Sequence, residues 1–237
     1  MADQLYLSLW FPNFRFEALP AVLVSVLRQF ARVSIGPAST GEPHSNRVSA
    51  ATVYPINFAE PPTYQRLYVN DDRSEDTSDS IIENAVAEAT EQLHDDMAYE
   101  FEMRWKLWAP VDADPQPSDP RIDIYPQFES VRLDTLWKLQ PATIKILGFG
   151  PQFDDATFEQ NGHIRIDFGL DTPWLAETLE DEQLDEDATK HIQQNVEMLL
   201  AFILSVEKNC GISSRLLWTE SGEPLAQKLI DRLQRVN

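Results

Sequence analysis

Tyr99–Trp108, with the sequence YEFEMRWKLW, decides the fold class of this chain. Its large apolar residues occupy every second position: Phe101, Met103, Trp105 and Leu107. Its charged residues fill the positions between them: Glu100, Glu102, Arg104 and Lys106. Because successive side chains of a strand point to opposite faces of a sheet, this pattern predicts a strand with one buried and one solvated face. Antiparallel sheets commonly have that arrangement.

Five further elements are predicted upstream of this strand from apolar periodicity and breaker residues. They are a strand at 5–10, a helix from about Pro20, strands at 48–58 and 63–69, and a helix that begins near Asp79. The order is then βαββαβ, which is typical of a ferredoxin-like arrangement. We therefore expect an α+β fold whose first half, residues 1–110, is ferredoxin-like.

A proline-rich stretch follows, VDADPQPSDP at 111–120, and it is predicted to link two halves. The second half, residues 121–237, is predicted to be a related or shifted arrangement of mainly antiparallel sheet and packed helices. Its expected strands lie at 121–128, 131–137, 142–149, 163–169 and 214–218, and its helices at 188–210 and from about Pro224. The Trp-Lys-Leu triplets that begin at Trp105 and Trp137 hint at a duplication, which the sequence leaves open.

The charge of the chain excludes several classes of partner. It has 39 acidic and 19 basic residues, with a formal net charge of -20. Direct binding to nucleic acid or to an anionic membrane requires the opposite sign, so neither is expected. The single cysteine, Cys210, cannot form an intrachain disulfide, and no apolar run approaches the roughly 20 residues of a membrane span. Together with the absence of a basic stretch before the first apolar residues, this predicts a cytoplasmic protein.

Standard catalytic and cofactor motifs are missing from the chain. Gly148-Phe149-Gly150 lacks the third glycine of a dinucleotide loop, and Pro151 follows it. No phosphate-binding loop or metalloprotease spacing is present, so we expect no cofactor and leave a metal site open. Ser221 lacks the flanking glycines of a nucleophile elbow and is interpreted as a helix cap, and Cys210 is interpreted as a packing residue. No catalytic residue is predicted.

A long acidic connection is the first candidate site. Pairing of 142–149 with 163–169 leaves a connection of roughly a dozen residues, a length that is often functional. Phe153 and Phe158 are expected to anchor it. The candidate ligand- or partner-binding residues are Asp154, Asp155, Glu159, His163 and Arg165. The competing interpretation is that these acids only keep a long loop soluble.

An aromatic patch just after the first strand is the second candidate: Trp10, Phe11 and Phe14. Such residues hold planar ligands or anchor a protein partner, and they also pack ordinary core edges.

These observations favour an acidic interaction or regulatory protein that binds a basic protein partner. A second hypothesis is an enzyme or ligand-binding protein with a pocket between the two halves, rimmed by carboxylates. A third, weaker hypothesis is a nucleic-acid mimic or toxin-neutralising protein. The oligomeric state is left open.

Overall fold

The computed structural model describes residues 3–33, 48–55, 65–69, 78–111, 136–154, 162–175 and 186–221. Its strands are β1 (Gln4–Trp10), β2 (Val48–Pro55), β3 (Gln65–Val69), β4 (Met97–Val111), β5 (Leu136–Phe149), β6 (Ile164–Leu170) and β7 (Ser214–Thr219). Its helices are a short 3-10 helix η1 (Phe16–Ala18), α1 (Leu19–Arg32), α2 (Ser78–Ala89), α4 (Thr172–Leu175) and α5 (Glu186–Asn209).

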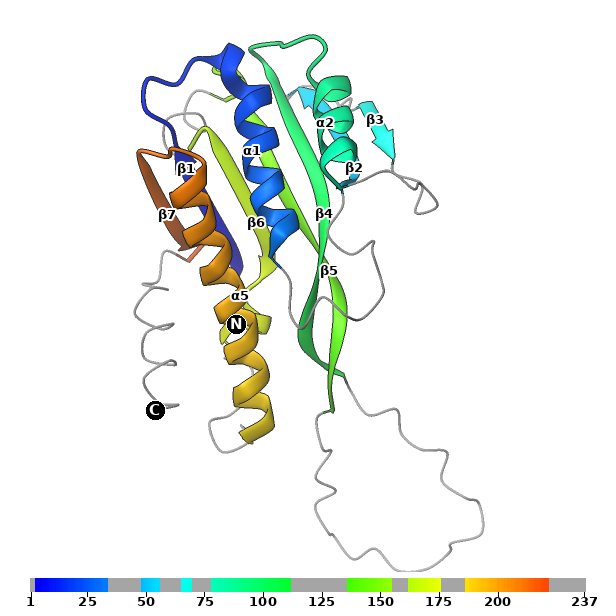
Figure 1. The fold of residues 1–237 in the computed structure, drawn as a ribbon, viewed down its shortest axis with the longest axis vertical. Helices are drawn as coiled ribbons and strands as arrows, with labels where there is room; N and C mark the ends of the chain where they lie inside the picture. The colour runs from blue at the N-terminus through cyan, green and yellow to red at the C-terminus, as the bar shows by residue number, and fades with distance from the viewer. Residues whose placement is uncertain are drawn as a thin grey trace, which may run out of the picture.

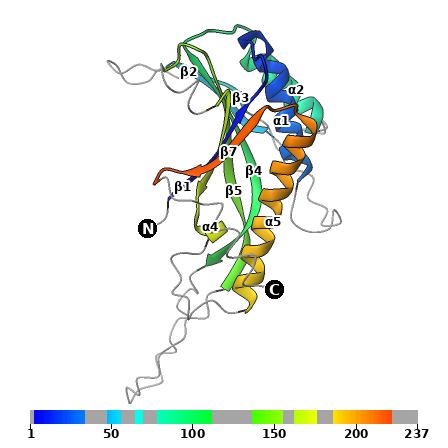
Figure 2. The same ribbon diagram turned by 90° about the vertical axis from the view of Figure 1, so that its left-hand side faces the viewer.

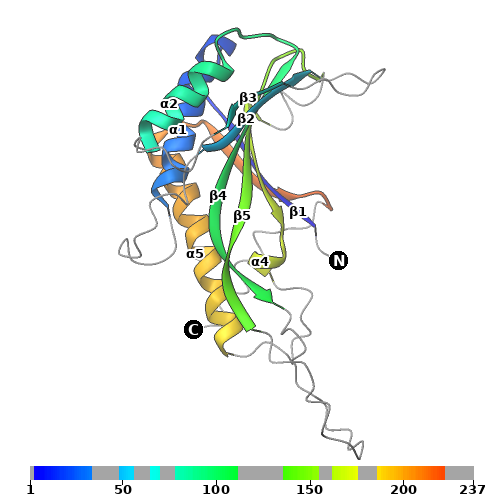
Figure 3. The same ribbon diagram turned by 90° about the vertical axis from the view of Figure 1, so that its right-hand side faces the viewer.

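All seven strands belong to one sheet, in the order β3-β2-β4-β5-β6-β1-β7 (Figure 1). Every neighbouring pair is antiparallel. Helices α1, α2 and α5 cover one face of this sheet, as the two side views show (Figure 2, Figure 3). The predicted mixed α+β class with an antiparallel sheet is therefore confirmed.

The ferredoxin-like arrangement of the first half is not confirmed, because β1 does not join the other strands of that half. β1 lies between β6 and β7 and pairs with both of them. β4 and β5, one from each predicted half, pair from Ala98 opposite Phe149 to Val111 opposite Leu136. The sheet thus continues across the predicted boundary. Residues 112–120 of the predicted linker lie outside the described residues, and the division into 1–110 and 121–237 remains a prediction.

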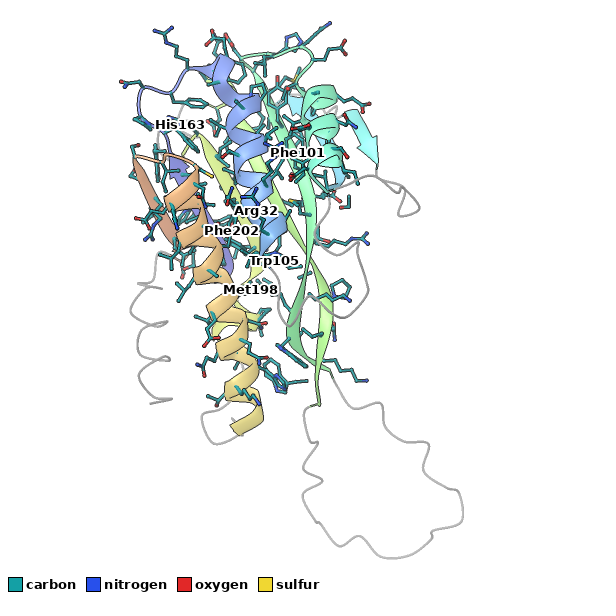
Figure 4. The ribbon with its side chains drawn as sticks, in the orientation of Figure 1. Arg32, Phe101, Trp105, His163, Met198 and Phe202 are labelled. Atoms are coloured by element: carbon teal, nitrogen blue, oxygen red, sulfur yellow. The ribbon has the colours of Figure 1, made fainter. Side chains whose placement is uncertain are left out.

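The predicted buried face of β4 forms the centre of the core. Phe101, Met103 and Trp105 are fully buried. The Trp105 ring stacks on Phe30 of α1 at 4.2 Å between centroids and meets the edge of Phe202 of α5 at 5.7 Å (Figure 4). Trp105 therefore joins the sheet to two of the helices that cover it.

The predicted strand at 142–149 belongs to β5, which also contains residues 136 and 137 of the strand predicted at 131–137; residues 131–135 lie outside the described residues. Pro141 lies inside it, opposite Lys106 of β4. A proline is tolerated in a strand where one edge has no strand partner. That condition holds here, because β6 pairs with β5 only between Lys145 and Gly148 among the described residues.

The long apolar helix predicted at 188–210 is α5, and its buried residues include Ile192, Val196, Leu199 and Ile203. The strand predicted at 214–218 is β7. The predicted strands at 121–128 and the closing helix from Pro224 lie outside the described residues.

Candidate functional site

Several strand ends meet at one end of the sheet, which is its upper end in Figure 1. Ala98 near the start of β4 pairs with Phe149 at the end of β5, and Gly148 pairs with Ile164 at the start of β6. Ile164 also pairs with Leu9 near the end of β1. The connections that leave these strands contain most of the candidate residues that the structure describes. We call this region the upper end of the sheet.

His163 joins the two regions that were predicted as separate sites. Its ring stacks on Phe14 with 4.2 Å between centroids, and its Nδ1 accepts a hydrogen bond from the backbone N–H of Phe11 at 3.0 Å. Its own backbone N–H donates to Leu9 O at 2.9 Å. Figure 4 places His163 at the upper end, beside the chain that leaves β1. The segment that contains Phe11 and Phe14 therefore packs against the start of β6.

Burial lowers the pKa of His163 below its ordinary value of 6.5. An Nδ1 that accepts a hydrogen bond carries no proton, so the neutral ring holds its proton on Nε2. In this position His163 acts as a neutral packing and hydrogen-bonding group. The other members of the aromatic patch differ in exposure, since Phe11 is buried while Trp10 and Phe14 are half-buried.

The glycine before His163 explains why the chain can come this close to β1. Gly162 has a φ of +89°, in the region that favours glycine. A Cβ at Gly162 would lie 2.9 Å from both the backbone N and O of Leu9. Any side chain here would push the start of β6 away from β1.

The predicted acidic connection begins with a turn that folds over the sheet. Phe153 is buried with Ala98, Leu147 and Phe149 in a small apolar cluster, so its predicted role as an anchor is confirmed. Asp154 follows it and is half-buried. Asp155, Phe158 and Glu159 lie outside the described residues. The proposed convergence of these acids with His163 therefore remains a prediction.

A second acidic turn, residues 91–96, packs against the turn at 150–154. Gly150 donates its N–H to Met97 O at 2.8 Å, and Gln152 donates its N–H to Asp95 O at 2.7 Å. A Cβ at Gly150 would lie only 2.2 Å from Asp95 O, so glycine is required at this contact. Tyr99 adds a further link, because its hydroxyl accepts the backbone N–H of His94 at 2.8 Å.

Carboxylates line the exposed side of α2 and continue into this turn: Asp79, Glu83, Glu88, Glu91, Asp95 and Asp96. Arg28 of α1 forms ion pairs with Asp79 and Glu83 at the start of the helix. In the part of the chain that the structure describes, no lysine or arginine forms an ion pair with the other four. We call these four, Glu88, Glu91, Asp95 and Asp96, the acidic face.

The acidic face was not predicted as a site, although the sequence contains a signal for it. The predicted apolar stripe of α2 contains Ile82, Val86, Ala89 and Leu93. Residues between the members of such a stripe point outward on a helix, and Glu88 and Glu91 occupy those positions. His94, Asp95 and Asp96 form a dense polar group shortly after this stripe. Only the three-dimensional structure shows that these residues lie beside the end of α2 and the turn at 150–154.

Arg165, the last of the predicted residues, lies on the other face of the sheet from α1, α2 and α5. Its guanidinium carbon is 5.4 Å from the centroid of the Tyr6 ring and 5.0 Å from that of Phe149. His163 and Asp167 lie two positions before and after Arg165 in the sequence. In the structure His163 contacts Phe11 and Phe14, and the Asp167 carboxylate accepts the N–H of Gly169 at 2.8 Å.

An ion pair lies nearby on the same face. Lys145 Nζ is 3.0 Å from a carboxylate oxygen of the buried Glu100, whose other oxygen accepts a hydrogen bond from the Tyr54 hydroxyl at 3.3 Å. Burial acts to lower the pKa of Lys145, but the hydrogen bond and charge of Glu100, with Glu102 and Asp167, raise it overall. Burial and the charge of Glu100 raise the pKa of Tyr54. Both side chains thus keep their protons at neutral pH.

Within the described ranges, no group of three or more His, Cys, Asp or Glu side chains is placed to hold a metal ion. None of the described helices is long and apolar enough to cross a membrane. Comparison of the chain with protein-family models, curated proteins and solved structures finds no match. The site must therefore be interpreted from its own geometry.

The lowered pKa of His163 predicts a pH-dependent stability. The unfolded chain binds a proton near pH 6.5, whereas the folded chain binds it only at lower pH. The free energy of unfolding should therefore fall as the pH drops from about 7 through the folded pKa. Urea unfolding at several pH values, with an NMR titration of His163, measures both quantities. In His163→Gln this part of the pH dependence should disappear, and a His163 pKa above 6.5 in the folded protein would contradict the assignment.

Proposed function

We propose that this chain is an acidic interaction protein that binds a basic protein partner through the acidic face. The observation that carries the proposal is a set of four exposed carboxylates for which the described part of the chain supplies no basic partner. Lysine and arginine side chains of another protein are the groups that would complement them. A cytoplasmic location belongs to the proposal and is supported by the single, unpaired Cys210.

The position of Glu88 in the last turn of α2, with Glu91 just after the helix, supports binding over solubility alone. The end of a helix carries the negative pole of its dipole, where acidic side chains are unfavourable and basic ones are favourable. α2 has no basic residue in its last turn, and Glu88 and Glu91 lie at that end. Solubility does not require acids at this particular place, whereas a basic partner would relieve the unfavourable charge.

The acidic face is also held on an ordered backbone. On the opposite side of α2, the side chains of four residues are buried in the core: Ile81, Ile82, Ala85 and Val86. The turn at 91–96 is fixed by the hydrogen bonds from Gln152 and to Tyr99. Binding to a surface that is already ordered loses less conformational entropy, so a larger part of the electrostatic attraction appears as affinity.

The hypothesis of a ligand pocket between two halves has less support. The strands on either side of the predicted boundary, β4 and β5, are joined directly by backbone pairing along their length. Of the carboxylates predicted at its rim, Asp154 is described and Asp155 and Glu159 are not. The hypothesis of a nucleic-acid mimic requires carboxylates spaced like phosphates along a continuous face, and the acidic face alone is too short to support it.

The proposal is tested by capture of partners from native lysate, with three forms of the protein compared quantitatively. The first is the unchanged protein. The second carries Glu88→Gln, Glu91→Gln, Asp95→Asn and Asp96→Asn. The third is a control with Glu17→Gln and Glu197→Gln, which changes exposed acids away from the acidic face.

We expect a basic protein to be captured by the unchanged protein and the control at about 50 mM salt and to be lost at about 500 mM, because salt screens exposed charges. The fourfold variant should capture much less of it. Equal capture by the fourfold variant and the unchanged protein would overturn the proposal. So would the absence of any basic protein at low salt.

A further inference from the structure

Arg165, on the face of the sheet opposite α1, α2 and α5, has an arrangement that its structural role does not explain. The Arg165 guanidinium lies over two aromatic rings, Tyr6 and Phe149. Its Nε is buried and has no hydrogen-bond partner among the residues that the structure describes. Among the described residues no carboxylate forms an ion pair with it, although the chain has about twice as many acidic as basic residues. Buried polar groups without a partner are rare and costly, so this one requires an explanation.

Packing alone would not require a buried Nε without a partner among the described residues. An arginine that only covers the Phe149 ring could do so with its aliphatic stem and turn its charged end to an acid or to water. Here the guanidinium carbon lies within 5.4 Å of the centroids of both the Tyr6 and Phe149 rings, and these contacts restrict its movement. A planar guanidinium held in this way is suited to two parallel hydrogen bonds with an oxyanion. The flanking rings thus prepare Arg165 for an anion.

The surroundings of Arg165 restrict the class of anion. Asp167 lies on the same side of β6, and Glu220 accepts a hydrogen bond from the Tyr6 hydroxyl at 3.2 Å. Burial, with the charges of Asp167 and Glu220, raises the pKa of Tyr6 to about 12. An anion here must approach in a negative field, and repulsion increases with its charge. A singly charged carboxylate is favoured over a phosphate.

An apolar strip runs beside Arg165 on the same face. Ser8 of β1 is paired with Arg165 on one side and with Leu216 of β7 on the other. Leu216 is 51% exposed, and the Trp218 ring lies tilted against the Tyr6 ring with 4.6 Å between centroids. The Trp218 indole is held in place because its Nε1–H donates to Ser8 Oγ at 3.0 Å. A ligand whose carboxylate binds Arg165 can therefore rest an apolar body on Trp218 and Leu216.

We propose that this face binds a small organic monocarboxylate with an apolar body, with Arg165 as its anion-binding group and Trp218 and Leu216 as its apolar contacts. The site is distinct from the acidic face, which lies at the end of α2 and in the turn at 91–96, whereas Arg165 lies on the face of the sheet opposite α2 (Figure 3). Failure of one proposal therefore leaves the other intact.

The test uses the full chain, with phenylacetate as the probe and NMR as the readout. Phenylacetate should shift the Arg165 Nε–H signal and the Trp218 indole signal in a saturable way. Benzylamine, which has a similar apolar body and the opposite charge, and inorganic phosphate should shift them far less. Saturable shifts by phosphate at equal or lower concentration would overturn the choice of a monocarboxylate. No shift with phenylacetate would overturn the site.

Variants then separate binding from packing. Arg165→Gln should weaken phenylacetate binding about tenfold or more, because it removes a charged hydrogen-bond donor. Arg104 is an exposed arginine of β4 on the same face of the sheet as Arg165. Arg104→Gln should therefore bind phenylacetate as the unchanged protein does. Should Arg165→Gln prove unstable, Arg165→Lys keeps the charge without the planar fork and should bind with intermediate affinity. Equal affinity in all these variants would contradict the role of Arg165.

Discussion

Trp105→Ala is expected to lower the free energy of unfolding by about 3–5 kcal/mol, the largest effect of any single change considered for this chain. Trp105 is fully buried and packs against Phe30, Phe168, Trp174 and Phe202. Truncation removes the ring that joins the sheet to α1 and α5 and leaves a cavity that these aromatic neighbours cannot fill. Chemical denaturation at equilibrium measures the loss.

Arg104→Ala is the matched control for this prediction, because Arg104 precedes Trp105 and is exposed on the other face of β4. Its effect is expected to stay within about 0.5 kcal/mol. If the two substitutions had similar effects, the assignment of the buried face of β4 would be wrong.

The second large effect on stability is expected from a substitution of Asn195, whose side chain forms hydrogen bonds with the backbone of β4. Asn195 Oδ1 accepts the N–H of Trp108 at 3.0 Å, and its Nδ2 donates to Trp108 O and to Pro173 O at 2.8 Å each. The side chain is fully buried in α5. It thus acts as an additional strand partner at a point of β4 that lies beyond the last residue paired with β2, Met103.

Asn195→Leu has nearly the same volume and removes all three hydrogen bonds. Because each buried group left without a partner costs about 1–3 kcal/mol, we expect a loss of about 3 kcal/mol or more in the free energy of unfolding. The amide of Trp108 should also exchange with solvent faster. Glu197→Ala, at an exposed position of the same helix, should have little effect on either measurement. Unchanged exchange at Trp108 in Asn195→Leu would contradict the role of the side chain as a partner of β4.

Individual elements of this fold could be predicted because their periodicity is local. The alternation at 99–108 predicts β4, and the apolar stripe from Ile192 to Ile203 predicts α5. The pairing of 142–149 with 163–169 was also predicted and is confirmed. For β4 and α5, the side chains on which the prediction depends lie within a few helical turns or strand residues of one another.

The order of the strands could not be predicted, because it depends on contacts between distant residues. The alternating leucines of β1, Leu5, Leu7 and Leu9, suit a place beside almost any buried strand. In the structure β1 lies between β6 and β7, more than 150 residues further along the chain. The ferredoxin-like prediction placed β1 in a sheet with the other strands of residues 1–110.

Individual residues of the candidate site were predicted, but the contacts between them were not. His163 and the aromatic patch were both named, yet the contact of His163 with Phe11 and Phe14 joins residues about 150 positions apart. His163 was expected to take part in ligand binding because of the acids near it in sequence. In the structure two phenylalanine rings and a backbone N–H surround it, and they favour a neutral packing role.

The central claim, that the acidic face binds a basic partner, is tested most directly by the affinity of the captured partner as a function of salt. Exposed ion pairs contribute about 0.2–1 kcal/mol each, so neutralising four carboxylates should weaken binding by roughly fourfold to several hundredfold at low salt. The account predicts that this difference shrinks as salt rises, until the fourfold variant and the unchanged protein bind alike. A dissociation constant that is independent of salt, or equal for both proteins at low salt, would contradict it.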